Sequence, residues 1–158
     1  MNLENSNWRL GTCCQFAEHK NKHLNFVAST KSQAIKNPER CIQKAFTNTN
    51  RLIDIMAFLS KEPKVLRLFR IRSDIWPCYT VPEIKSSYSL VEKDLDALLQ
   101  KSKEIANQYD IRLSMHPAQF CVLGSTNPKV VKNSIAELEY HAKIGASLVD
   151  DPRDFVIN

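Results

Sequence analysis

The stretch Leu113–Phe120 holds the residue types best suited to chemistry in this chain, in the order Leu-Ser-Met-His-Pro-Ala-Gln-Phe. Apolar Ile111 and Leu113 alternate with polar residues, which predicts a short strand. Pro117 lacks an amide hydrogen and stops strand pairing, so we expect His116 at the strand's carboxyl end, where α/β proteins bind ligands and metals. A neutral imidazole there can bind a divalent metal ion. A hydrogen-bonded structural histidine is the alternative.

Alternating strand-like and helix-like segments are expected to position this histidine. The expected strands cover residues 9–13, 65–71, 111–115 and 155–157. The expected helices cover residues 37–59, 89–105 and 127–142, with a long loop over 15–36. Strand–helix repeats imply parallel strands joined by right-handed crossovers. With 3 glycines and no Gly-x-Gly-x-x-Gly motif, the pattern favours a TIM-type barrel over a dinucleotide-binding sheet. Residues 1–158 would form one domain, the first half of such a barrel, and the chain looks truncated.

Composition adds a basic half and no membrane segment. Residues 1–72 carry 13 Lys or Arg against 5 Asp or Glu, whereas residues 73–158 carry 9 against 12. A basic half suits a polyanionic partner such as DNA. Five cysteines without zinc-pair spacing are expected to be reduced thiols, with the adjacent Cys13 and Cys14 buried. No apolar run approaches the ~20 residues that span a bilayer, and residues 1–8 lack a signal peptide's apolar core, so we expect an intracellular protein.

Four segments, in this order and spacing, resemble the UV-damage endonuclease family. They are Arg9–Gly11, Leu68–Ile71 with Ser73, Asp74 and Pro77, Ser114–Phe120, and Ser134–Tyr140. The His-Pro-x-Gln-aromatic block is the most specific of them. The resemblance runs from Arg9 to the last residue. It implies the amino-terminal portion of a barrel enzyme that recognises UV photoproducts in double-stranded DNA and hydrolyses the backbone on their 5′ side.

The resemblance also implies roles for individual residues. His116 would be a ligand in a cluster of divalent ions, expected to be Mn²⁺, that generates the attacking hydroxide. Gln119 and Phe120 would probe the lesion, because side chains that fill a vacated base stack lower the cost of opening the duplex. A phenylalanine folded back onto the core is the alternative. The family's later His, Asp and Glu ligands begin beyond Asn158, and Val81 stands about where many members carry a histidine.

Polar residues after the first two expected strands are candidates for holding the phosphate backbone. These candidates are Arg72, Ser73, Gln15, Lys20 and Lys22. For the lysines, a solvated loop surface is the alternative.

Three other residues have expected roles or positions. Phe16 is expected to contact displaced bases. Asp74 is expected to cap its loop or to pair with Arg70. His141 lies within a helical pattern and is expected on the surface.

Two other functions remain open. A non-catalytic DNA-binding remnant would keep the basic surface and the wedge without enough metal ligands to cut DNA. A sugar-isomerase-like metal-dependent barrel would share the histidine at a strand end. Because a half-barrel exposes two strand edges and apolar interior, we also expect self-association or a partner that supplies the missing half.

Overall fold

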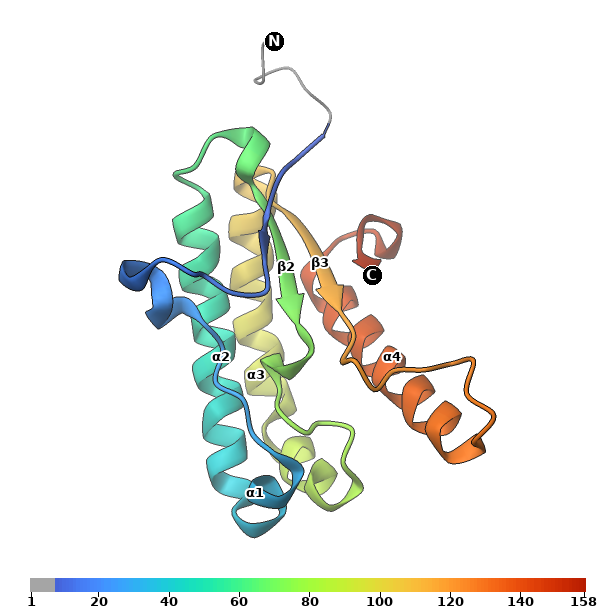
Figure 1. Ribbon diagram of the computed structural model, residues 1–158. Coiled ribbons are helices and arrows are strands. Elements are labelled where there is room, and N and C mark those ends of the chain that lie inside the picture. The colour runs from blue at the N-terminus through green and yellow to red at the C-terminus, as the bar shows by residue number, and fades with distance from the viewer. Residues whose placement is uncertain (1–7) are drawn as a thin grey trace.

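The computed structural model describes residues 8–158, which build one parallel sheet with helices packed against it (Figure 1). The strands are β1 (Thr12–Cys13), β2 (Leu68–Arg72), β3 (Arg112–His116) and β4 (Val156–Ile157). They pair in the order β1-β2-β3-β4, and every pair is parallel. Sequential parallel strands joined by helices are the arrangement of a TIM-type barrel, which has eight such strands. The predicted α/β class and half-barrel topology are confirmed.

Three long helices alternate with the strands along the chain, one between each strand and the next. They are α2 (Pro38–Leu59), α3 (Pro82–Tyr109) and α4 (Pro128–Leu148). The shorter segments are α1 (Lys31–Lys36) and the 3-10 turns η2 (His19–Leu24), η3 (Lys64–Leu66), η4 (Ser73–Ile75) and η5 (Pro152–Asp154). Each long helix starts with proline, and Asn37 and Asn127 cap α2 and α4 by accepting backbone N–H groups. Proline suits this position because its missing N–H would have no partner within the helix.

The two faces of the sheet differ in chemistry. Phe69 and Ile71 of β2 and Leu113 and Met115 of β3 are buried in the core. The register pairs Phe69 with Leu113 and Ile71 with Met115, so these four side chains share the face that the helices cover. The intervening residues of β2 and β3 point to the opposite face, which corresponds to a barrel's interior. That face is largely polar, and it carries the candidate site.

Several expected boundaries are wrong. The strand expected at 9–13 is reduced to Thr12–Cys13, and before it the Leu10 N–H bonds to the Val65 carbonyl, outside β2. The helix expected from residue 89 begins at Pro82. The expected loop over 15–36 contains η2 and α1, and the latter begins with a capping box between Thr30 and Gln33. Helices of six residues are too short to show a clear helical period in the sequence.

Within residues 8–158, no helix has both the length and the apolar content needed to cross a membrane. The expectation of an intracellular protein was based in part on residues 1–8. Residues 1–7 lie outside the described residues.

Candidate functional site

Three neighbouring strands bring Cys13, Arg70 and His116 together. The Arg70 guanidinium contacts His116 Nδ1, donates to the Asn158 backbone oxygen at 3.0 Å and lies 3.4 Å from Cys13 Sγ. These groups come from β1, β2 and β3, and the contacts run across the polar face of the sheet. His116 is therefore placed at a strand's carboxyl end, as expected from Pro117.

The His116 imidazole can take two tautomers in this geometry. Nδ1 also lies 2.9 Å from the Asn158 backbone oxygen. With a proton on Nδ1, the ring donates to this oxygen and leaves the Nε2 lone pair free, which is the form that binds metals. With Nδ1 unprotonated, the ring instead accepts from Arg70, because a guanidinium only donates. Arg70 and Asn158 thus set the orientation of the ring.

The loop after β3 presents Gln119 and Phe120 to solvent. Both residues are exposed, and the Phe120 side chain has 76% of its surface accessible. Phe120 therefore does not fold back onto the core, which was the alternative expectation. Ser134 of α4 holds the far side of the loop by accepting the Val122 N–H at 2.8 Å. The aromatic ring is therefore free to contact a ligand.

The turn after β2 pairs Arg72 with Asp74. Their side chains form an ion pair at 2.5 Å, so the predicted pairing of Asp74 with Arg70 is wrong. The cause is local, since Asp74 lies in the turn directly after Arg72, whereas Arg70 reaches toward His116. Burial raises the pKa of Asp74, and the Arg72 guanidinium opposes this shift. Ser73 lies between them and is half-buried.

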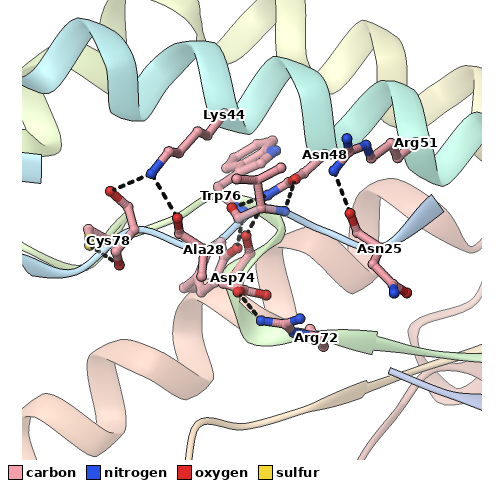
Figure 2. Close-up of polar contacts among 12 residues, drawn as sticks. Asn25, Ala28, Lys44, Asn48, Arg51, Arg72, Asp74, Trp76 and Cys78 are labelled. Atoms are coloured by element: carbon pink, nitrogen blue, oxygen red, sulfur yellow. Dashed lines mark hydrogen bonds and ion pairs between the residues drawn. The ribbon is translucent and has the colours of Figure 1, made fainter. Parts of the chain in front are cut away.

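A buried asparagine of α2 fixes this turn (Figure 2). Asn48 donates to the Asp74 carbonyl at 2.9 Å and to the Val27 carbonyl at 3.1 Å, and it accepts the Val27 N–H at 2.7 Å. One turn earlier on the same helix, Lys44 donates to the Ala28 carbonyl at 2.8 Å. The segment before α1 and the turn after β2 are thus joined through α2.

Helix α4 anchors the same turn from another side. The Tyr140 hydroxyl accepts the Trp76 N–H at 3.0 Å, and the Trp76 indole donates to Thr49 at 3.1 Å. All three side chains are buried. The backbone that aims Arg72 is therefore held by two helices.

The candidate phosphate-binding residues after β1 do not join the Arg70–His116 cluster. Gln15, Lys20 and Lys22 are exposed, and within residues 8–158 none of them contacts Arg70 or His116. Gln15 and Lys20 instead line a cavity of about 450 Å³ that also includes Leu66, just before β2. The loop leaves the end of β1 and passes to α2, which η2 contacts (Figure 1).

Phe16 is buried, so the expectation that it contacts displaced bases is wrong. Its ring stacks on Phe69 with centroids 6.1 Å apart and meets Phe58 edge-on at 5.5 Å. The expectation that Cys13 is buried is also wrong. Cys13 is exposed because β1 is an edge strand of the sheet.

Sequence reasoning missed a buried Glu137–His141 pair beneath the loop after β3. His141 is fully buried rather than on the surface, because this part of α4 faces β3, and burial lowers its pKa. Its Nε2 lies 3.9 Å from the Glu137 carboxylate. Burial raises the pKa of Glu137, against hydrogen bonds from the Thr80 hydroxyl and the Ala118 N–H. The i, i+4 spacing beside Tyr140 and Ile144 was the available signal.

Residues 8–158 do not by themselves build a metal centre. No three His, Cys, Asp or Glu side chains of this range converge on one point. His116 offers one imidazole, whereas protein metal sites combine several ligands. Val81, at the position where the family resemblance suggested a further histidine, packs partly buried against the core.

This arrangement defines a class: a barrel-type α/β protein whose polar groups gather at the carboxyl ends of its parallel strands, where such proteins bind ligands. A family model described as UV-endonuclease UvdE matches residues 9–158. The chain belongs to this family.

Individual relatives agree with this assignment. A putative UV-damage endonuclease of Acanthamoeba polyphaga mimivirus is 32% identical over 144 residues, covering 86% of this chain and 41% of that protein. A UV DNA damage endonuclease of Nostoc sp. is 35% identical over 96 residues, covering 61% of this chain and 29% of that protein. The crystal structure of SacUVDE superposes with a TM-score of 0.75 at 27% identity, over 90% of this chain and 46% of that one. The chain thus spans less than half the length of these relatives.

Proposed function

We propose that this chain forms the amino-terminal part of a UV-damage endonuclease that binds duplex DNA carrying UV photoproducts and hydrolyses the backbone 5′ to the lesion. Membership of the family supports the endonuclease class. The observation that carries the assignment to this surface is the contact of Arg70 with His116 at the end of β3, the strand that leads into the loop with the exposed Phe120. A cation and an imidazole that can bind a metal lie together there, and the next loop along the chain supplies an exposed aromatic ring, the groups that cleavage beside a distorted base pair requires.

His116 would contribute one ligand to the divalent metal ions, expected to be Mn²⁺. The remaining ligands would have to come from outside the described residues, since no three converge within them. Bound ions would activate water and stabilise the leaving oxygen. This chain's own part is to orient the imidazole, which the Asn158 backbone oxygen does from 2.9 Å.

Gln119 and Phe120 would enter the duplex at the lesion. Phe120 is 76% exposed and therefore can stack on a base without first leaving the core. Such base–aromatic stacking contributes about 1–3 kcal/mol per base. Arg72 and Ser73 would hold phosphates at the next strand end, while Gln15, Lys20 and Lys22 would follow the backbone farther away.

The test uses an end-labelled duplex with a single thymine dimer, incubated with this chain and Mn²⁺. We expect a 5′-side nick once self-association or an added partner supplies the remaining metal ligands, and this nick should require the dimer and the metal and be abolished by His116→Ala. His23→Ala is the matched control, because His23 is also exposed but lies in η2. A nick that survives His116→Ala, or one that ignores the lesion, would contradict the proposed site.

A DNA-binding role without cleavage is the second candidate, favoured because no three metal-binding side chains converge within residues 8–158. It predicts preferential, salt-sensitive binding to the dimer duplex with no nick. Absence of both binding and cleavage would refute both candidates for this chain.

A further inference from the structure

Two adjacent thiols at the end of β1 lie unusually close together. Side chains of successive strand residues point to opposite faces, which separates neighbouring cysteines. Here the backbone turns at Cys14, which has a left-handed φ of 62°. The two sulfur atoms are brought to 3.8 Å on the same side of the chain.

Backbone contacts hold this turn in place. The Cys14 N–H donates to the Arg70 carbonyl at 3.0 Å, and the Gln15 N–H donates to the Cys13 carbonyl at 2.6 Å. Cys13 also pairs with Arg70 in the parallel ladder between β1 and β2. The short sulfur–sulfur distance is therefore built into the strand end.

Both cysteines are free, and neither is fully buried. Cys13 is exposed and Cys14 is partly exposed. Burial, together with the neighbouring Cys13 thiol, raises the pKa of Cys14 to about 11. The pair therefore presents itself as a dithiol.

The surroundings select among thiol-binding ligands. A structural zinc site needs four ligands, and within residues 8–158 no third ligand joins the pair. The Arg70 guanidinium, 3.4 Å from Cys13 Sγ, also disfavours a cation. A trivalent organoarsenical needs only two sulfurs, since its third bond is to carbon, and the product is uncharged.

We propose that Cys13 and Cys14 form a bidentate site for a trivalent organoarsenical of the type R–As(OH)₂. Each thiol displaces one hydroxyl group from arsenic. Two As–S bonds form, two As–O bonds break and two water molecules leave with the thiol protons. Arsenic stays trivalent, so no oxidant or reductant is required.

A second thiol pair, Cys41 and Cys78, is the rival site. The Cys78 thiol lowers the pKa of Cys41 to about 7. However, Cys41 is only 1% exposed, and its sulfur contacts the Pro77 carbonyl at 3.0 Å. An arsenical would have to open the core to bridge these two sulfurs.

The test exposes the chain to one equivalent of phenylarsine oxide, which hydrates to R–As(OH)₂, and measures the adduct by intact mass spectrometry with glutathione as competitor. We expect one adduct that resists glutathione and is removed by 2,3-dimercaptopropanol. Cys13→Ser should weaken retention by about 100-fold, because the second As–S bond becomes impossible. Cys121→Ser is the matched control, since Cys121 is partly exposed but lies on another loop.

Two further variants keep the result decisive. At position 14 the replacement is asparagine, because asparagine tolerates a left-handed backbone better than serine does. Cys14→Asn should also lose retention of the arsenical, while Cys41→Ser should keep it. Thermal melting verifies that each variant is folded. Retention that survives Cys13→Ser, or that is lost only in Cys41→Ser, would overturn the proposal.

Discussion

Replacing Asn48 by alanine should lower the free energy of unfolding by about 3 kcal/mol. The carboxamide is fully buried and makes three hydrogen bonds to the backbone of Val27 and Asp74. Each such bond contributes about 1 kcal/mol, and a buried group left unpaired costs about 1–3 kcal/mol. Alanine's higher helix propensity returns about 0.6 kcal/mol. For a chain of this size, the loss corresponds to a melting temperature roughly 6–12 °C lower.

The matched control for this prediction is Asn50→Ala. Asn50 lies on the same helix but is exposed, and its amide bonds only to the Phe46 carbonyl. It gains the same helix propensity and should change stability by less than about 0.5 kcal/mol. Urea and thermal unfolding followed by circular dichroism measure both variants. If Asn48→Ala fell within about 1 kcal/mol of Asn50→Ala, the assignment of Asn48 as the joint between the two segments would be refuted.

Three further perturbations test other parts of the molecule. Gly145→Ala would place a Cβ within 2.8 Å of the Phe155 ring. This substitution should lower the free energy of unfolding by about 1–3 kcal/mol, and adding Phe155→Leu should recover part of the loss. An unchanged melting temperature for Gly145→Ala would contradict this packing. Burial raises the pKa of Glu137, so the folded carboxyl binds its proton more tightly than the unfolded one, and stability falls as pH rises from below 4.5 to neutral. Glu137→Gln has no carboxyl to titrate at this position, so its stability relative to the unsubstituted chain should rise with pH when both are melted under the same conditions. A difference in stability that does not depend on pH would argue against the raised pKa of Glu137. Phe120→Ala should reduce the preference for a dimer-containing duplex by roughly 10- to 100-fold in a binding titration, whereas the exposed Val122→Ala on the same loop should not, and equal effects would exclude a specific wedge.

Much of the fold followed from local sequence signals. Alternating apolar residues marked β2 and β3 within a few residues, and Asn-Pro pairs marked the starts of α2 and α4. The start of α3 was missed because Val81 precedes Pro82 and makes no side-chain cap. Helix starts without a capping residue leave little local signal, and burial of Ile84 and Tyr88 against the core decides this one.

The candidate site was only partly predictable. The position of His116 followed from one proline, but its contact with Arg70 depends on which arginine of β2 remains free. Both Arg70 and Arg72 point to the polar face, and the register places Arg72 opposite His116. Asp74 in the next turn binds Arg72, which leaves Arg70 to reach the imidazole. Which arginine contacts His116 therefore depends on tertiary contacts, and the spacing of residues in the sequence does not predict these.

His141 shows the same limit on a helix. The helical pattern over 127–142 predicted His141 on the surface of this helix. In the structure the buried side centres instead on Tyr140, His141 and Ile144. This face is selected by its neighbours, since α4 contacts both α3 and β3.

The two strand ends that carry the candidate site are held very differently, and this difference has a functional consequence. The turn after β2 is fixed at the Asp74 carbonyl by α2 and at the Trp76 N–H by α4, through buried side chains on both sides. The loop after β3 is exposed at Phe120, and it is joined to α4 through Ser134 and the half-buried Glu137. A group that binds phosphate gains from a fixed position, whereas a wedge that enters a base stack must adjust to the opened duplex. If this division holds, Asn48→Ala should weaken binding to damaged and undamaged duplexes equally, while Phe120→Ala should affect the damaged duplex alone.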